Sequence, residues 1–404
     1  MCGKTMKIQV ITTRSVFSSD ATTNRMLSLA KGLMAVGHEV QITCLTAIES
    51  TSLGEISGKV YGIPYIHLIS QTSFNSNSKL IKVLLVLGGT ARGIKKLKNE
   101  SPPEAILLLS ISPIHLFAYL WMAMILSIPV FHERNEYPHL SIRTFLDRVF
   151  LWLYLKHIVP RFAGLALMTR ALMKYFEENC PRCPPTLHLP MTVDPERFLI
   201  ETLPPIAGRY IAHCGTSFGD KDGVPILVEA FARISVEFPD VKLVLIGSDV
   251  DQNAMEHLQQ RIQELGIQER VVLTGQIMRD EMPAWLQHAE LLVLARPANL
   301  QAAGGFPTKL GEYLISARPV VVTRVGEISD YLQDGVNAWL AEPGSVENFT
   351  AKLREVLTLD SASRNTVGLR GRDTALSVFN FMVQGRRFAQ FIEEQAAIYR
   401  DNRI

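Results

Sequence analysis

The sequence has no large excess of charge of either sign. Lysine and arginine together number 41 and aspartate and glutamate 39, among 404 residues. Basic residues also do not alternate with aromatic ones, a pattern typical of proteins on which nucleic-acid bases stack. We therefore expect no nucleic-acid partner, and we expect any basic surface to be local.

Cysteine is scarce and irregularly spaced. Five cysteines, an odd number, indicate a reducing compartment and no disulfide framework. Cys180 and Cys183 have the spacing of a metal-binding pair, but they lie in a proline-rich segment and no second pair accompanies them. Residues 6–11 lead directly into a strand pattern, without the apolar stretch and cleavage site of a secretory signal. These features predict a cytoplasmic protein without a cysteine metal site.

The sequence also lacks the fingerprint G-x-G-x-x-G of dinucleotide-binding proteins. Its first segment nevertheless predicts a βαβ unit, with an apolar strand over 7–12, a polar loop over 18–25, a helix that ends near Gly37 and a strand over 38–43. The sequence therefore lacks the main feature that would indicate a dinucleotide-dependent dehydrogenase.

One long hydrophobic run, residues 114–131, approaches the length of a membrane span. Pro113 and Pro129 bracket it, His115 interrupts it, and strand patterns flank it. These features favour a buried core helix over a span.

Two other stretches suggest contact with a membrane surface. Residues 145–162 combine aromatic and basic side chains, which suits either a core element or the edge of a membrane face. Residues 78–100 place basic side chains among aliphatic ones at roughly helical spacing, which suits either an ordinary surface helix or one that lies on anionic lipid. The basic residues of this second stretch are Lys79, Lys82, Arg92, Lys95, Lys96 and Lys98.

The length and the pattern of elements predict two domains. A proline-rich segment from Pro181 to Pro205 connects them. After it, short apolar strands alternate with helices, which predicts a parallel sheet with helices on both faces. The expected fold class is α/β, with two Rossmann-like domains over residues 1–204 and 205–375 that face each other across a cleft.

The C-terminal domain contains a candidate anion site. Gly304 and Gly305 allow the backbone to approach a ligand, and Pro307 suits the first position of a helix. The free N–H groups of Thr308 and Lys309 would then point out of that helix end, where the helix dipole favours a phosphate.

Glu312 lies one helical turn beyond Thr308 on the same face. A carboxylate at that place suits hydrogen bonds from a diol, such as the ribose of a nucleotide whose diphosphate rests on the helix end. An ordinary αβ unit with a surface glutamate is the alternative.

A second loop, residues 215–224, follows another predicted strand. Its glycines and Lys221 suit a diphosphate, which needs backbone donors and a nearby cation. An ordinary turn between strand and helix fits the same residues.

The run 305–314, Gly-Phe-Pro-Thr-Lys-Leu-Gly-Glu-Tyr-Leu, resembles the donor-binding motif of the GT-B retaining glycosyltransferases of family 4. Many members have two glutamates in this motif; Glu312 matches the second, and Gly304 stands at the first position. The resemblance implies that the backbone of Phe306, Pro307 and Thr308 meets the donor. It also implies a C-terminal helix over 376–404 that returns to the N-terminal domain.

The resemblance extends to the other loops of the C-terminal domain. Gly215 and Lys221 match a glycine and a lysine that contacts the donor phosphates, whereas Thr216 stands where the family has an arginine. We expect Arg296 to supply that missing charge. The segment 274–277, with Gly275 and Ile277, is similar to the loop that lines the base.

In the N-terminal half, His132 follows an apolar strand and matches the histidine that faces the donor sugar in this family. We expect catalytic roles for His132, Lys221 and Glu312. The acceptor side is expected to include Glu133 and Glu136 together with two residues of the first polar loop, Thr22 and Asn24.

The predicted reaction is transfer of a sugar from a nucleotide-diphosphate sugar to an acceptor, with retention of configuration. A lipid-linked sugar of a cell-surface polysaccharide is the favoured acceptor. We expect no cofactor and no metal, because Asp249 and Asp251 follow a strand and suit a helix cap. A nucleotide-sugar epimerase and a nucleotide-sugar binder without transfer activity are the alternatives.

Overall fold

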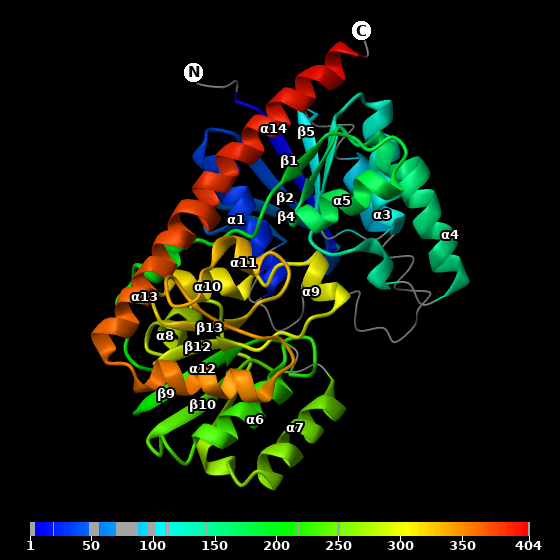
Figure 1. The fold of residues 1–404 in the computed structure, drawn as a ribbon. Coiled ribbons are helices and arrows are strands. Elements are labelled where there is room, and N and C mark those ends of the chain that lie inside the picture. The colour runs from blue at the N-terminus through cyan, green and yellow to red at the C-terminus, as the bar shows by residue number, and fades with distance from the viewer. Residues whose placement is uncertain are drawn as a thin grey trace. The chain divides into compact units, whose positions relative to one another are not determined.

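The computed structural model describes residues 5–18, 20–47, 56–69, 88–95, 102–109, 111, 113–141, 144–216, 218–248 and 251–402. The chain forms two compact units. The first comprises residues 1–190 and 381–404, and the second comprises residues 191–380. Each unit is an α/β fold around its own sheet, as predicted (Figure 1).

The first unit contains an eight-stranded sheet in the order β3-β4-β2-β1-β5-β6-β7-β8. All neighbouring strands are parallel except β3 and β4. The central strand β1 has β2 on one side and β5 on the other, which is the arrangement of a doubly wound sheet. The strands are β1 Lys7–Thr12, β2 Glu39–Ala47, β3 Ser57–Val60, β4 Ile63–Ile69, β5 Ala105–Leu109, β6 Val130–Arg134, β7 Gly164–Leu167 and β8 Thr186–His188.

Helices cover both faces of this sheet. The C-terminal helix α14 packs closely on α1, because a Cβ on Gly32 would lie 2.9 Å from the Cα of Gly385. Phe388 and Ile392 of α14 are buried in the core of this unit, so the predicted return of the C-terminal helix is confirmed. The helices are α1 Ala21–Ala35, α3 Pro113–Ile125, α4 Phe145–Leu153, α5 Arg170–Asn179 and α14 Phe381–Asp401, with short helical turns η2 Pro138–Ser141, η3 Tyr154–Ile158 and η4 Val159–Arg161.

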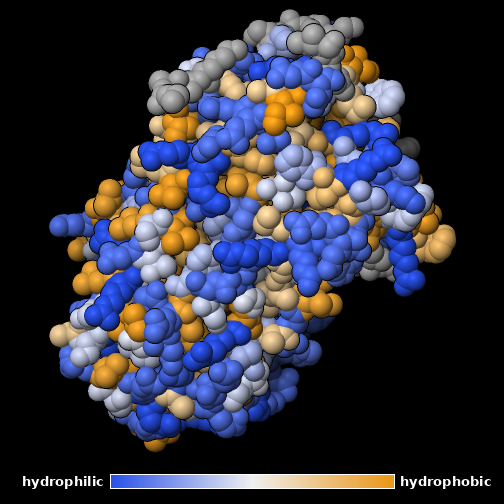
Figure 2. All heavy atoms as spheres, turned by 45° about the horizontal axis from the view of Figure 1, so that its top comes forward, coloured by the Kyte–Doolittle hydropathy of each residue, from blue (hydrophilic) through white to orange (hydrophobic). Residues whose placement is uncertain are grey.

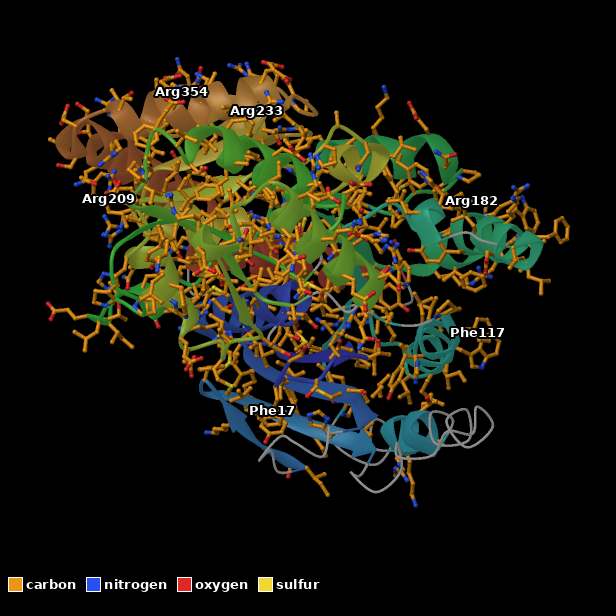
Figure 3. The ribbon with its side chains drawn as sticks, turned by 90° about the horizontal axis from the view of Figure 1, so that it is seen from below. Phe17, Phe117, Arg182, Arg209, Arg233 and Arg354 are labelled. Atoms are coloured by element: carbon orange, nitrogen blue, oxygen red, sulfur yellow. The ribbon has the colours of Figure 1, made fainter. Side chains whose placement is uncertain are left out.

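The hydrophobic run 114–131 forms α3 and then enters β6. One face of α3 is buried, with Leu116 and Tyr119 in the interior. The opposite face exposes Phe117 and Trp121, each 58% accessible, so the predicted core helix is buried on one face only. Phe117 lies on the outer side of α3 (Figure 3). In the described part of the chain, no helix has both the length and the apolar character that a membrane crossing requires.

The second unit contains a six-stranded parallel sheet in the order β11-β10-β9-β12-β13-β14. Counted along this unit, the order is 3-2-1-4-5-6, that of a dinucleotide-binding sheet. The strands are β9 Arg209–Cys214, β10 Val241–Ile246, β11 Val271–Gly275, β12 Leu291–Leu294, β13 Val320–Thr323 and β14 Trp339–Ala341. The helices are α6 Val224–Ile234, α7 Gln252–Glu264, α8 Met282–Gln287, α9 Leu300–Gly304, α10 Lys309–Ile315, α11 Ile328–Tyr331, α12 Val346–Thr358 and α13 Ser361–Thr374, with short turns η5 Pro195–Phe198, η6 Gln268–Arg270 and η7 Ala375–Phe379.

The two units meet along the chain after Pro190 and after Asn380, whereas the sequence suggested boundaries after 204 and 375. The segment that follows Pro190 packs on the second sheet's helices, since Gln287 of α8 donates a hydrogen bond to the carbonyl oxygen of Phe198 at 2.8 Å. The proline-rich connection is therefore largely part of the second unit. On the face shown in Figure 2, hydrophobic side chains are scattered among hydrophilic ones.

Candidate functional site at the carboxyl edge of the second sheet

The loops that follow β9 and β12 lie at the topological switch point of the second sheet. These two strands are neighbours, and the strand order runs outward from them in opposite directions. Ligands of open parallel sheets bind outside the carboxyl ends of the strands at such a point. The two loops, residues 215–223 and 295–308, contain most of the donor residues predicted from the sequence.

Glycine allows close contact between the backbones of these loops. Gly223 has a φ of +71°, and a Cβ there would lie 1.9 Å from the carbonyl oxygen of Ala295. Gly247, after β10, has a φ of +118°, and a Cβ there would lie 2.0 Å from the carbonyl oxygen of Gly215. A side chain at either position would force the loops apart. Neither Gly223 nor Gly247 was among the predicted site residues.

Lys309 forms an ion pair beside the first loop. Its Nζ lies 2.5 Å from Oδ2 of Asp222, and both side chains are largely buried. A Cβ on Gly215 would lie 3.0 Å from the same Nζ. Burial alone would raise the pKa of Asp222, but the neighbouring charge of Lys309 lowers it, so the carboxylate is ionised. The sequence analysis assigned Lys309 a backbone role and did not foresee this pair.

His213 lies next to this pair at the end of β9. It is fully buried, and its Nδ1 lies 3.0 Å from the carbonyl oxygen of Val293. Burial and the charge of Lys309 lower the pKa of His213 to about 4, so the ring is neutral at physiological pH. Among the described residues its Nε2 has no hydrogen-bond partner.

Glu312 forms an ion pair with Arg197. Nη1 of Arg197 contacts Oε1 of Glu312, and Nη2 donates to the carbonyl oxygen of Arg279 at 2.7 Å. The side chains of Arg197 and Glu312 are 10% and 12% exposed. The sequence analysis missed Arg197, because the segment around it was interpreted as a connection between domains.

The helix after the glycine pair starts later than predicted. Residues 300–304 form α9, capped by the side chain of Asn299, which accepts a hydrogen bond from the N–H of Ala302 at 2.8 Å. The predicted start at Pro307 is wrong, since Thr308 is the N-cap of α10 and Lys309 its first residue. The shift occurs because the glycine pair ends one short helix before the next begins.

Gly305, Phe306 and Pro307 form a buried connection between α9 and α10. The ring of Phe306 packs against Tyr331 and Phe379, with centroid distances of 5.6 Å to each. This aromatic cluster fixes the loop that leads into α10.

The remaining predicted donor residues differ in exposure. Thr216 and Lys221 are exposed in the loop after β9. Gly275 ends β11 with a φ of +68°, and Ile277 follows it, half-buried. Arg296, directly after β12, is only 5% exposed. Burial raises the pKa of Asp222, whereas the charge of Lys309 and, to a smaller extent, that of Arg296 lower it. Strands β9, β11 and β12 thus bring these residues to one edge of the sheet.

In the first unit, His132 lies inside the protein. It is 1% exposed, its Nδ1 lies 3.1 Å from the carbonyl oxygen of Leu108, and its ring contacts Phe162 at a centroid distance of 5.0 Å. Burial lowers the pKa of His132 to about 3, so the ring is neutral. This placement suits a structural residue better than a proton donor.

Glu133 is also buried, on the other face of β6. Its Oε1 accepts a hydrogen bond from Nε of Arg25 at 2.6 Å, with the two side chains 4% and 2% exposed. Arg25 further donates to the carbonyl oxygens of Leu189 and Pro190 at 2.9 and 2.8 Å. Glu136, by contrast, is half-buried beyond the end of β6.

Thr22 and Asn24 belong to the first turn of α1 and not to a loop. The helix starts at Ala21 because the side chain of Asp20 accepts a hydrogen bond from the N–H of Thr23 at 2.8 Å. Both Thr22 and Asn24 are half-buried near the carboxyl end of β1.

The predicted helix cap is confirmed at Asp251, whose carboxylate accepts a hydrogen bond from the N–H of Asn253 at 3.0 Å. Asp249 and most of the basic stretch 78–100 lie outside the described residues. In the part of the chain that the structure describes, no three histidine, cysteine or acidic side chains are grouped as metal ligands. Burial raises the pKa of both the Cys180 and the Cys183 thiol, so neither is activated.

The carboxyl edge of the second sheet therefore combines two lysines, two arginines, two carboxylates and the N-terminal end of α10. Cations and backbone N–H groups bind oxyanions, and a carboxylate accepts hydrogen bonds from hydroxyl groups. The arrangement suits a ligand that carries both an anionic group and hydroxyls.

The part of the chain that forms this edge of the sheet matches a known protein family. Residues 208–359 match the family of the glycosyl transferases group 1. A GDP-mannose-dependent alpha-(1-6)-phosphatidylinositol monomannoside mannosyltransferase of Mycolicibacterium smegmatis is 27% identical over 217 residues, which cover 51% of this chain and 55% of that protein. N-acetyl-alpha-D-glucosaminyl L-malate synthase of Bacillus anthracis is 27% identical over 186 residues, 46% of this chain and 44% of that protein. The chain thus spans about half the length of these curated relatives.

Solved structures share the fold over nearly the whole chain. Anabaena Alr3699/HepE in complex with UDP and glucose has a TM-score of 0.71 at 16% identity, covering 96% of this chain and 99% of that one. Sucrose-phosphate synthase from Thermosynechococcus elongatus has a TM-score of 0.75 at 15% identity, covering 97% of this chain and all 100% of that one. Residues 208–359 thus match the glycosyl transferases group 1, and the chain as a whole has the GT-B fold.

Proposed function

We propose that this protein is a retaining glycosyltransferase that moves a sugar from a nucleotide-diphosphate sugar to an acceptor. The observation that carries the proposal is the convergence of Lys221, Lys309 and Glu312 on the switch point of the second sheet, within the region that matches the family. The donor is a co-substrate, and no cofactor takes part.

The donor diphosphate would bind between the loop after β9 and the start of α10. Lys221 supplies a mobile cation, and the N–H groups of Thr308 and Lys309 supply donors. The backbone of Gly215 and Thr216 would lie close to the phosphates, and the buried side chain of Arg296 would add positive charge. Glu312 accepts hydrogen bonds from the ribose diol, with its orientation held by Arg197.

The other donor contacts follow from the family resemblance. Gly275 and Ile277 would line the base at the end of β11, and Gly305, Phe306 and Pro307 would pass along the sugar-phosphate portion of the donor. The aromatic cluster around Phe306 keeps this backbone in one position. Such preorganisation reduces the cost of donor binding.

Charge develops on the departing diphosphate as the bond from the anomeric carbon to phosphate oxygen breaks. Lys221 and the end of α10 would stabilise that charge, so the step needs no metal. The leaving phosphate would accept the proton of the attacking hydroxyl on the same face of the sugar, which retains configuration. His132, neutral and buried in the first unit, would not transfer this proton.

We propose a lipid-linked acceptor, bound by the first unit at the membrane surface. Helix α4 exposes Phe145, Leu146 and Trp152, which are 76%, 75% and 53% accessible. Exposed basic side chains accompany them, including Arg148 and Lys156. An apolar face bordered by basic residues is typical of helices that lie on anionic lipid. Acceptor residues near the carboxyl ends of β1 and β6 would be Thr22, Asn24 and Glu136, with Glu133 holding α1 against the sheet.

Donor turnover tests the proposal and its alternatives. The full chain is incubated separately with UDP-glucose, suggested by the Anabaena complex, and GDP-mannose, suggested by the mycobacterial relative. Slow release of UDP or GDP, accelerated by lipid extract that becomes glycosylated, supports a transferase. Interconversion of the sugar would indicate an epimerase, an activity that none of the compared proteins named above supports, and binding without either reaction would indicate a binder.

A further inference from the structure

His132 and Arg134 lie on the same face of β6, because side chains alternate along a strand. Glu133, between them, points to the opposite face and pairs with Arg25 of α1. Arg134 is the last residue of β6, so its side chain emerges at the carboxyl edge of the first sheet, where ligands of parallel sheets bind.

Among the described residues, the guanidinium of Arg134 has no counter-charge. Its Nε is buried and has no hydrogen-bond partner in this part of the chain, and its Nη2 makes a long contact of 3.4 Å with the carbonyl oxygen of Glu136. No carboxylate of the described residues forms an ion pair with it. A guanidinium with a buried, unpaired Nε and no counter-charge is costly, so its presence at a sheet edge indicates an anionic ligand.

A second unsatisfied donor lies beside it. Tyr154, the first residue of η3, is 4% exposed, and its Oη has no hydrogen-bond partner among the described residues. Its ring lies 6.3 Å from that of His132, centroid to centroid. Burial raises the pKa of Tyr154 to about 12, and the nearby charge of Arg134 opposes this rise. The hydroxyl is therefore protonated and able to donate.

Three half-buried rings contact one another beyond the end of β6. Tyr137 stacks on His139 at 5.0 Å, and Tyr175 of α5 contacts both rings at 5.2 and 5.3 Å. Burial raises the pKa of Tyr175, and the charge of Arg134 counteracts part of that effect. The rings leave Arg134 half-buried and thus accessible to a small anion.

We propose that Arg134 and Tyr154 bind a phosphate group of the acceptor, with Tyr137, His139 and Tyr175 as the rim of the site. The inference rests on the proposed transferase function and specifies the acceptor as a lipid phosphate. The chain position supports this source of phosphate: Tyr154 directly follows α4, whose exposed apolar side chains suit a lipid surface. A phosphate that accepts a hydrogen bond from Tyr154 would therefore lie next to the segment proposed to contact lipid.

Binding of decyl phosphate and of inorganic phosphate to the full chain, measured by calorimetry, tests the site. The wild type should bind decyl phosphate, and Arg134→Met should weaken that binding at least tenfold. Arg134→Lys should recover only part of the affinity, because an ammonium cannot reproduce the fork of donors, and Tyr154→Phe should cost about threefold. The control Arg161→Met removes an exposed basic residue of the same segment and should change little. Tighter binding of decyl phosphate than of inorganic phosphate identifies the lipid-linked source, and equal binding would assign the site to free phosphate and overturn the lipid assignment.

Unchanged affinity in Arg134→Met, or loss of affinity in Lys221→Ala instead, would overturn the proposal, since the anion would then occupy another site. If Arg134→Met does not fold, Arg134→Lys and Tyr154→Phe decide the question. Donor hydrolysis should persist in the Arg161→Met control. Its absence from the wild type would refute the transferase proposal separately from this site.

Discussion

Arg197 and Glu312 are 115 residues apart in the chain and form an ion pair at the edge of the second sheet. Arg197 also donates to the carbonyl oxygen of Arg279, so its guanidinium links the segment after Pro190 to α10 and to the loop after β11. This pair orients one carboxylate oxygen of Glu312. We infer that the pair holds the carboxylate of Glu312 in position to accept hydrogen bonds from the donor ribose.

Replacing Glu312 by alanine should raise the dissociation constant of the donor nucleotide tenfold or more, because a charge-assisted hydrogen bond contributes about 1.5–3 kcal/mol. Calorimetric titration of UDP and GDP measures this change. Glu264→Ala is a matched control, since Glu264 also pairs with an arginine, Arg261, but on the exposed surface of α7. Equal affinities for wild type and Glu312→Ala would contradict the assigned role.

Much of the second unit could be predicted from its sequence. Its buried strands are short apolar runs such as Val320–Thr323, and a parallel sheet with both faces covered requires such runs. The loop that contains Gly215 and Lys221 was predicted because it follows a strand directly. The start of α10 was not predicted correctly, because a proline suits several positions near a helix start. The short helix α9, capped by Asn299, was not predicted either.

Pairs between distant segments were beyond prediction from one sequence. Arg25 lies 108 residues from Glu133, and nothing in the local pattern of either residue indicates the other. The motif around His132 suggested a catalytic role because it follows a strand. The burial of His132, however, depends on which elements cover that face of the sheet. Residues 78–87 and 96–100, with most of the basic stretch, lie outside the described structure, so that hypothesis remains a prediction.

Glu133→Leu should lower the free energy of unfolding by about 3–5 kcal/mol, because it leaves the buried charge of Arg25 without its partner. The double variant Arg25→Met, Glu133→Leu should recover a substantial part of this loss, since an apolar pair can replace a buried ion pair. Urea denaturation followed by circular dichroism measures both. A single variant as stable as the wild type would show that the pair does not hold α1 on the sheet.

Stability should fall as the pH decreases from about 6.5 towards 4. Burial lowers the pKa of His132 to about 3 and that of His213 to about 4, whereas histidine in the unfolded chain titrates near 6.5. The unfolded state therefore binds more protons in this window, and the free energy of unfolding is highest above it. His132→Phe should reduce the slope of urea stability against pH by up to about 1.4 kcal/mol per pH unit. An unchanged slope would show that His132 becomes protonated in the folded protein.

Phe145→Ser combined with Trp152→Ser should weaken binding to vesicles that contain anionic lipid at least tenfold, because two exposed apolar side chains of α4 would no longer enter the membrane interface. Vesicle co-sedimentation measures this loss of binding. Comparison of low and high salt measures how much the basic residues contribute to it. Val236→Ser is the matched control, since Val236 is 85% exposed but belongs to the second unit. Equal losses in the control would mean that the contact is not specific to α4.

The most direct test of the account is a crystal structure of the protein with a bound nucleoside diphosphate. We predict that the diphosphate contacts Lys221 and the N–H groups of Thr308 and Lys309, and that the ribose hydroxyls lie within hydrogen-bond distance of Glu312. A nucleotide bound away from the loops after β9 and β12, with Glu312 paired only to Arg197, would contradict the proposed donor site.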